Sequence, residues 1–96
     1  MKESTVRRNF LAWCRERDIL TIKLSMLGSR GESGWPDRLL LGGVFQTAFC
    51  ELKATGKEPT KLQWSKIRML RKRGYKVWIY SGVEQNVLKQ IEAYFQ

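Results

Sequence analysis

The spacing of Asp37, Glu51 and Lys53 constrains the fold of this 96-residue chain more than any other feature. Asp37 opens a short apolar segment, residues 37–41, which two glycines separate from a second apolar segment that ends at Glu51 and Lys53. Paired glycines between two such segments indicate a β-hairpin. Residues i and i+2 of a strand point to the same face, so Glu51 and Lys53 are expected to project together. The pattern predicts two adjacent strands with two carboxylates and a lysine gathered at one end.

Other segments carry helical patterns. Ser4 or Thr5 can cap a first helix that runs to about Arg17, and apolar residues recur within it at helical spacing. Thr60 can cap a second helix, which Gly74 would end. A terminal helix is indicated by apolar residues near the end of the chain, namely Val83, Val87, Leu88, Ile91 and Phe95.

Four segments have the alternation or the apolar content of β-strands. They are residues 21–25, 37–41, 44–53 and 75–80. In the last of them, Val77 and Ile79 are expected to face inward. A glycine-rich loop, residues 28–34, separates the first two strands. The order α-β-β-β-α-β-α predicts one α/β domain over residues 1–96, with a central mixed sheet flanked by helices.

The charge balance indicates a polyanionic partner. The chain has 18 Lys and Arg against 9 Asp and Glu, for a net charge of +9, and it contains no His. This imbalance favours binding to nucleic acid. The absence of His excludes His-dependent catalysis and disfavours a typical zinc site. A metal would have to be bound by oxygen ligands, which favours Mg²⁺ or Mn²⁺.

The sequence lacks the marks of a membrane or secreted protein. No apolar segment approaches the roughly 20 residues that a spanning helix needs, and the N-terminus lacks the hydrophobic stretch of a signal peptide. Cys14 and Cys50 fall in an amphipathic helix and an apolar strand, as expected of small core residues in a reducing compartment. A disulfide is the less favoured alternative. We therefore expect a soluble, cytoplasmic protein.

The acidic residues predict a metal site. Carboxylates that converge on one face repel each other, so a fold tolerates them beside a counter-charge or a metal. Asp37, Glu51 and the backbone carbonyl of Leu52 are the candidate ligands. A bound Mg²⁺ would polarise a phosphodiester and lower the pKa of an attacking water. Lys53 would then stabilise charge or assist proton removal, which predicts a metal-dependent nuclease.

Gln63 extends the candidate site. It shares a helix face with Ile67 and Leu70, so it is expected to point toward the sheet and to orient a water or Lys53. The alternative for Glu51 and Lys53 is an ion pair on an edge strand, which contributes about 0–1 kcal/mol. The combination of the Pro-Asp start, the hairpin and the glutamine helix favours the metal site.

Basic and aromatic residues outside this site predict contact surfaces. Phosphate contacts are expected from basic side chains near the two helices and the Asp37 loop. These residues are Arg7, Arg8, Arg30, Arg38, Lys57, Lys61 and Lys66. The alternative is a solvated helix face. Trp64 and Trp78 do not coincide with the inward-facing positions of the predicted helix and strand that contain them. We therefore expect both side chains to be exposed at a subunit interface.

Taken in order, these motifs resemble the VRR-NUC family of the PD-(D/E)XK nuclease superfamily. The match begins with Glu3, near the start of the first helix, and then covers most of the chain. It continues through Gly34-Trp35-Pro36-Asp37-Arg38, Glu51-Leu52-Lys53-Ala54, Thr60-Lys61-Leu62-Gln63 and Gly74-Tyr75-Lys76-Val77.

The resemblance implies a restriction-endonuclease-like core and a Mg²⁺- or Mn²⁺-dependent DNA endonuclease of the stand-alone phage or bacterial type. It further implies a homodimer that acts on branched DNA such as Holliday junctions, with Glu3 reaching the metal from the first helix. An acidic residue in a first turn is also stabilised by the helix dipole without any catalytic role. The alternative functions are a non-catalytic basic DNA-binding module and a flap or restriction-type nuclease.

Overall fold

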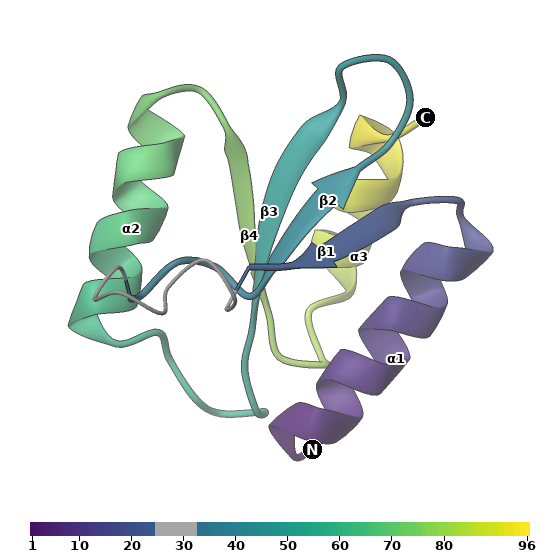
Figure 1. Ribbon diagram of the computed structural model, residues 1–96. Helices are drawn as coiled ribbons and strands as arrows, with labels where there is room; N and C mark the ends of the chain where they lie inside the picture. Colours follow the sequence, from purple (N-terminus) through teal and green to yellow (C-terminus); the bar gives the residue numbers. More distant parts are fainter. Residues whose placement is uncertain (25–32) are drawn as a thin grey trace.

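The computed structural model describes residues 1–24 and 33–96 (Figure 1). Its elements are α1 (Glu3–Glu16), β1 (Leu20–Lys23), β2 (Arg38–Leu41), β3 (Thr47–Leu52), α2 (Lys61–Lys72), β4 (Lys76–Tyr80) and α3 (Gln85–Tyr94). The strands form one sheet in the order β1-β2-β3-β4, in which β3 and β4 are parallel and the other pairs antiparallel. The expectation of an α/β fold with a mixed sheet flanked by helices is confirmed.

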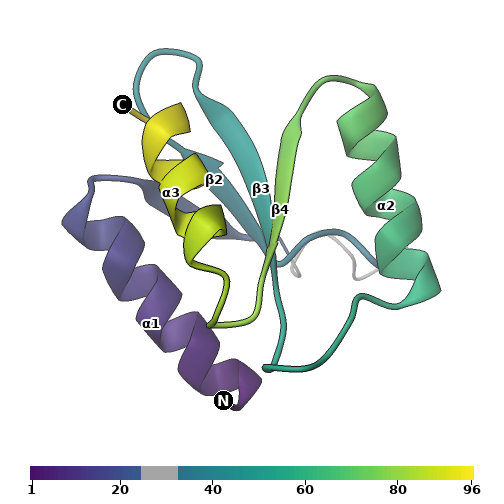
Figure 2. The ribbon, with the colours of Figure 1, turned by 180° about the vertical axis from the view of Figure 1, so that it is seen from behind.

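The helices cover the two faces of the sheet unequally (Figures 1 and 2). α1 and α3 lie over one face and enclose the main core. That core is built from Val6, Phe10, Cys14, Ile19, Leu40, Ala48, Cys50, Leu52, Trp78, Tyr80 and Ile91. α2 covers part of the opposite face, where Ile67 and Leu70 pack with Val77 in a smaller cluster. The sheet therefore has helices on both faces only near β3 and β4.

The predicted exposure of Trp64 and Trp78 is wrong. Trp78 is only 8% exposed, and its indole Nε1 donates a hydrogen bond to Gln90 Oε1 at 3.0 Å. Trp64 is partly buried against the Ile67 cluster. β4 has α2 on one face and α3 on the other, so residues on both of its faces are buried.

The ends of most elements differ from the sequence-based bounds, most clearly at the starts of α1 and β3. α1 begins at Glu3 with Lys2 as its N-cap, so the prediction that Ser4 or Thr5 caps it is wrong. β3 begins at Thr47 because residues 42–46 form the hairpin turn, in which Gly42 N donates to Gln46 O and Gln46 N to Gly43 O. Most of the predicted loop 28–34, including Arg30, lies outside the described residues.

Cys14 and Cys50 are fully buried and unpaired, as the sequence predicts for core residues. Burial raises the pKa of the Cys14 thiol to about 12 and that of Cys50 well above its ordinary value, so both thiols stay protonated. Within the described ranges, no helix combines the length and apolar character that a membrane crossing requires.

Candidate metal centre

Asp37 and Glu51 lie on the same face of the sheet. The last register pair between β2 and β3 is Arg38 with Cys50, and one step further along both strands places Asp37 opposite Glu51. Directly opposed residues of an antiparallel pair project to one face with Cβ atoms about 5 Å apart. Leu52 N donates to Asp37 Oδ2 at 2.8 Å, which fixes the Asp37 carboxylate against the end of β3. The backbone thus brings two carboxylates together.

Glu51 is a buried carboxylate with an incomplete set of partners. It is 1% exposed, and its Oε2 lies 3.5 Å from Lys53 Nζ. Its Oε1 has no hydrogen-bond partner within residues 1–24 and 33–96. Burial, followed by the negative charge of Asp37, raises the pKa of Glu51 to about 7, and Lys53 offsets only part of that rise. An unpaired buried oxygen of this kind is a position that a cation would satisfy.

A third oxygen faces the same side. The N–H and C=O of one strand residue point in the same lateral direction, and the N–H of Leu52 points to Asp37. The Leu52 carbonyl therefore leaves β3 toward Asp37 as well. In the part of the chain that the structure describes, no three His, Cys, Asp or Glu side chains are close enough to hold a metal. Two carboxylates, a carbonyl and waters fit Mg²⁺, which is usually bound by one or two carboxylates and keeps several waters.

Lys53 is held in place by β4. Its backbone N donates to Tyr80 O at 3.0 Å, which continues the parallel ladder one residue past the end of β3. Gly34, three residues before Asp37, has φ +88° and lies so close to Leu62 of α2 that a Cβ would meet its side chain at 2.7 Å. The Lys53 side of the site is therefore set by a backbone hydrogen bond, and the Asp37 side by close packing of Gly34 on α2.

Gln63 has a local structural role that the sequence analysis did not assign. Its Oε1 accepts from Thr60 N at 2.8 Å, and Thr60 Oγ1 accepts from Gln63 N at 3.2 Å. These two bonds form a capping box at the start of α2. The Thr-x-x-Gln spacing is the sequence signature of that motif and could have identified it. The amide nitrogen of Gln63 is the part of the side chain left to orient a water or a phosphate.

Two further glutamates, Glu3 and Glu84, lie at the same end of the molecule as Asp37 and Glu51. Glu3 is exposed in the first turn of α1, whose start is tied to the chain after β3 because Thr55 N donates to Met1 O at 3.0 Å. Glu3 does not join the Asp37 and Glu51 carboxylates in a group of three. Glu84, which the sequence analysis did not single out, accepts from Ser81 N at 2.8 Å and Ser81 Oγ at 2.6 Å. Both carboxylate oxygens of Glu84 therefore already accept hydrogen bonds from Ser81.

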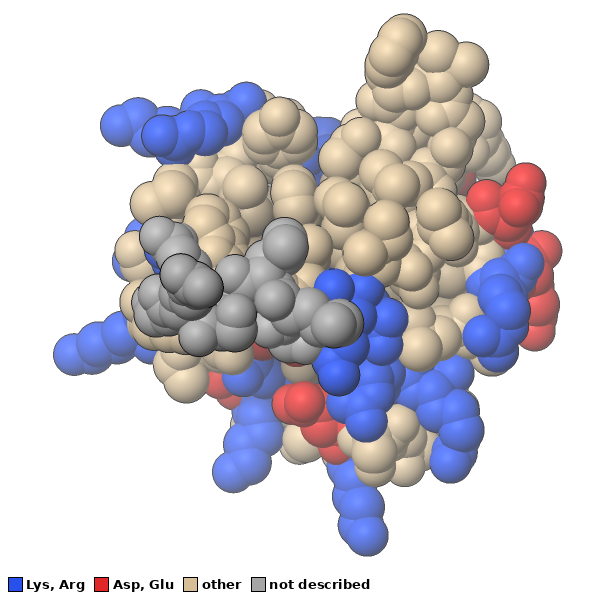
Figure 3. Space-filling model, viewed as in Figure 1, with Lys and Arg blue, Asp and Glu red and all other residues tan. Residues whose placement is uncertain are grey.

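The basic residues expected to contact phosphate lie in different places. Arg7, Arg8, Lys57 and Lys61 are exposed, and Figure 3 shows Lys and Arg side chains projecting around the lower rim of the molecule. Lys66 Nζ lies 4.4 Å from the centre of the Trp35 ring. Arg38 follows Asp37 directly, so it points to the opposite face of the sheet, where its charge acts on Cys14.

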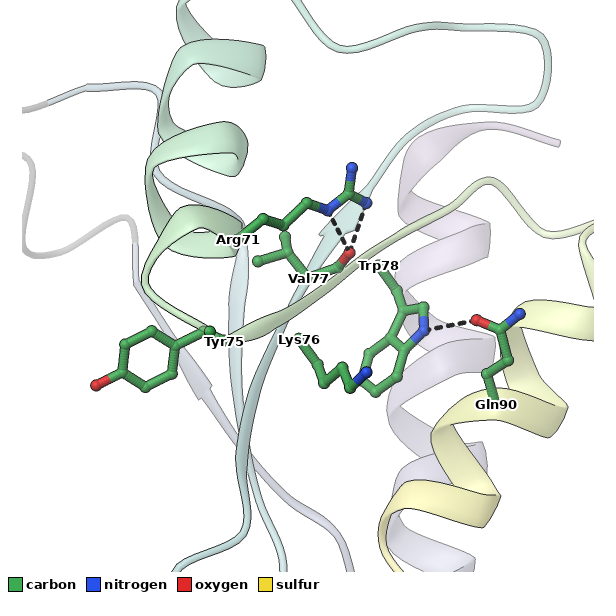
Figure 4. Close-up of a pocket in the computed structure, with 7 residues that line it drawn as sticks. Arg71, Tyr75, Lys76, Val77, Trp78 and Gln90 are labelled. Carbon is green, nitrogen blue, oxygen red and sulfur yellow. Dashed lines mark hydrogen bonds between the residues drawn. The ribbon is translucent and has the colours of Figure 1, made fainter.

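A separate cavity of about 450 Å³ lies at the open edge of β4 (Figure 4). Arg71 crosses this edge, where its Nε and Nη2 both donate to Val77 O, at 3.2 and 2.7 Å. The cavity is at the start of β4, whereas Leu52 pairs with Tyr80 at its end. It therefore lies at the opposite end of the sheet from Lys53 and is not part of the metal centre.

No protein-family model matches this chain, and a search of curated proteins finds no match either.

The buried Glu51 carboxyl is expected to make the stability of the metal-free protein depend on pH. Its folded pKa of about 7 exceeds the ordinary 4.5, so the unfolded chain loses this proton first as the pH rises. The contribution of Glu51 to the free energy of unfolding should fall by roughly 3 kcal/mol between those two values. Urea unfolding in EDTA across this range, on wild type and Glu51→Gln, measures the difference. If the free energy of unfolding changes equally with pH in wild type and in Glu51→Gln, the prediction is wrong.

Proposed function

We propose that this protein is a Mg²⁺- or Mn²⁺-dependent DNA endonuclease with a PD-(D/E)XK core of the VRR-NUC kind. The observation that carries the proposal is the buried Glu51, opposite Asp37 and beside Lys53, with one oxygen that has no hydrogen-bond partner among the described residues. Burying a carboxylate next to a second one costs stability, so the arrangement is explained better by a bound cation than by packing.

Asp37, Glu51 and the Leu52 carbonyl would hold the metal, which when bound supplies Lewis-acid activation of the phosphodiester and of the attacking water. Asp37 has one oxygen engaged by Leu52 N and can offer the other. The Lys53 ammonium, 3.5 Å from Glu51 Oε2, would donate to a phosphate oxygen and stabilise the negative charge that develops there. Gln63 would orient a water or the phosphate through its amide nitrogen.

The net charge and the exposed basic residues support DNA as the substrate. We propose that the protein acts as a homodimer on branched DNA such as Holliday junctions, because two symmetric centres suit paired cuts across a four-way junction. Glu3, at the same end of the molecule as Lys53, would contribute through a water rather than as a member of the carboxylate pair.

DNA binding is expected to weaken steeply as salt rises. If about five basic side chains neutralise phosphates, affinity should fall roughly 10²–10³-fold between about 50 and 200 mM salt. Fluorescence anisotropy with labelled junction DNA and the Glu51→Gln variant measures binding without cleavage. An affinity that changes less than about threefold over this range would mean that these basic side chains do not contact the DNA phosphates.

The proposed function is tested with purified protein and four labelled DNAs: a four-way junction, a flap, a duplex and a single strand. Each is incubated with Mg²⁺, with Mn²⁺ and with chelator. We expect cleavage that requires metal and is fastest on the junction. Cleavage that persists in chelator would contradict the mechanism.

A second candidate function is a DNA-binding module without catalysis. The 3.5 Å contact between Lys53 and Glu51 favours it, because the lysine already balances one acidic charge. This alternative predicts DNA binding that metal does not affect, and no cleavage of any of the four DNAs.

A further inference from the structure

The open edge of β4 carries a groove that lies outside the proposed metal centre. The cavity of about 450 Å³ at this edge shares Lys76, Trp78 and Gln90 with a neighbouring cavity of about 410 Å³, which Ala93 and Tyr94 also line. Because the two cavities share three residues, they form one continuous groove from α2 across β4 to α3. Each is within the size range of small-molecule sites. We call the combined cavity the edge groove.

The α2 end of the edge groove is positively charged. It is lined by Arg71 and Lys76, and neither takes part in an ion pair among the described residues. Within residues 1–24 and 33–96, no Asp or Glu lines either cavity. The two charges are therefore available to an anionic ligand.

The polar side chains of the edge groove present hydrogen-bond donors. Arg71 Nε and Nη2 both donate to Val77 O, which holds the guanidinium in place, and Figure 4 shows the third nitrogen pointing away from Val77. Gln90 Oε1 accepts from Trp78 Nε1, which leaves Gln90 Nε2 as a donor. The N–H and C=O of one strand residue point in the same lateral direction, so the Val77 N–H also faces the open edge. Two acceptors are used and several donors remain, which favours a phosphate.

The α3 end of the edge groove is apolar and aromatic. Ala93 lines it together with the half-buried Tyr94, whose ring packs edge-on against Trp78 at 5.9 Å between ring centres. Lys76 and Trp78 are two residues apart on β4 and project to the same side, as Figure 4 shows. The cationic end and the aromatic end therefore adjoin. A phosphate beside a flat ring is the structure of a nucleotide, and bases stack on aromatic side chains.

We propose that the edge groove binds a nucleotide unit. Its phosphate lies at Arg71, Lys76 and Gln90, and its base lies against the rings at the α3 end. The unit belongs to a free nucleotide or to a single strand, because the bases of a duplex keep their faces stacked on each other. The edge groove is at the opposite end of the sheet from Lys53, so this binding does not depend on the proposed nuclease function.

The test is a ¹⁵N NMR titration in EDTA, with adenosine monophosphate and with a hexadeoxyadenylate strand as ligands. The side-chain amide of Gln90 and the indole N–H of Trp78, whose signal is identified with Trp78→Phe, should shift until the site is saturated. Lys76→Glu and Arg71→Gln should each weaken binding by about tenfold or more. Tighter binding of the strand assigns the edge groove to nucleic acid, and equal binding of the two ligands assigns it to free nucleotides.

Lys89→Glu is the matched control for Lys76→Glu, because it makes the same change of charge. Lys89 is also exposed and precedes Gln90 on α3, but it lines a different cavity with Trp13. This variant should bind within about twofold of wild type. Circular dichroism checks that the variants are folded. Lys76 has an exposed side chain, so Lys76→Glu tests the proposal even if loss of the contact between Arg71 and Val77 unfolds Arg71→Gln.

The proposal is overturned if neither ligand shifts the Gln90 and Trp78 signals, or if Lys89→Glu and Lys76→Glu weaken binding equally. Inorganic phosphate that binds as tightly as adenosine monophosphate would show that the base makes no contact, and would overturn it. A hexaglutamate peptide that binds more tightly than the strand would identify an acidic protein segment as the partner and overturn it too. Metal-dependent DNA cleavage by a protein whose Gln90 and Trp78 signals do not shift would retain the enzyme and remove only the nucleotide site.

Discussion

Replacing Lys53 with alanine is expected to slow metal-dependent DNA cleavage by about 10²–10³-fold. The ammonium lies 3.5 Å from Glu51 Oε2 and is the cation closest to the carboxylate pair among the ion pairs of the described residues. Its loss removes the donor that would stabilise charge on the phosphate. Single-turnover cleavage of a labelled junction in Mg²⁺ measures the rate, and anisotropy in Ca²⁺ measures binding, which should change by only a few-fold.

The matched control for this substitution is Lys72→Ala, which removes an exposed lysine from the last turn of α2. It should leave the cleavage rate within about twofold, because a single exposed charge far from the reacting groups contributes little. If Lys53→Ala cleaves at a rate close to that of Lys72→Ala, Lys53 has no part in the chemistry.

Replacing Trp78 with alanine is expected to destabilise the protein by about 3–5 kcal/mol. Trp78 is buried under α3, packs edge-on against Tyr94 at 5.9 Å between ring centres, and donates to Gln90. In a chain of this size such a loss approaches the whole free energy of unfolding. Thermal or urea denaturation followed by circular dichroism measures it.

Trp78→Phe separates the two contributions of this residue. It keeps most of the ring packing and loses the indole hydrogen bond, so a loss of about 1–2 kcal/mol is expected. A Trp78→Ala variant that is as stable as wild type would mean that the side chain lies on the surface, as the alternation of β4 suggests.

The carboxylate pair follows from short-range sequence patterns. The glycine hairpin fixes which strands are neighbours, and the two-residue spacing puts Glu51 and Lys53 on one face. Asp37 then faces Glu51 because both lie one step past the last paired residues. The cap of α2 is equally local, since Thr60 and Gln63 need only each other.

The missed features depend on contacts between distant segments. Alternation separates buried from exposed residues only where one face of a strand meets solvent, and β4 meets α2 and α3 on its two faces. Val44 and Phe45 read as a continuation of β3 because apolar residues at a turn carry no turn signal. Phe45 has φ +59° in this turn, and the neighbouring Gln46 Nε2 donates to Tyr94 O, 48 residues away, a contact that local patterns do not reveal.

The unpaired oxygen of Glu51 is also a tertiary property. The sequence shows a glutamate two residues from a lysine, but not that the carboxylate is buried or that only one of its oxygens meets the lysine. The position of Arg38, in contrast, could have been predicted from the sequence. Arg38 follows Asp37 directly, and adjacent residues of a strand point to opposite faces of the sheet, so the two side chains were not expected to share a site.

The most direct test of the account is anomalous diffraction from crystals of the protein soaked in Mn²⁺. We expect one peak at about 2.1–2.3 Å from a carboxylate oxygen of Asp37, from Glu51 Oε1 and from the Leu52 carbonyl, and no such peak in Glu51→Gln crystals. A well-ordered site in which Mn²⁺ is absent, or bound away from these three oxygens, would contradict the proposed metal centre.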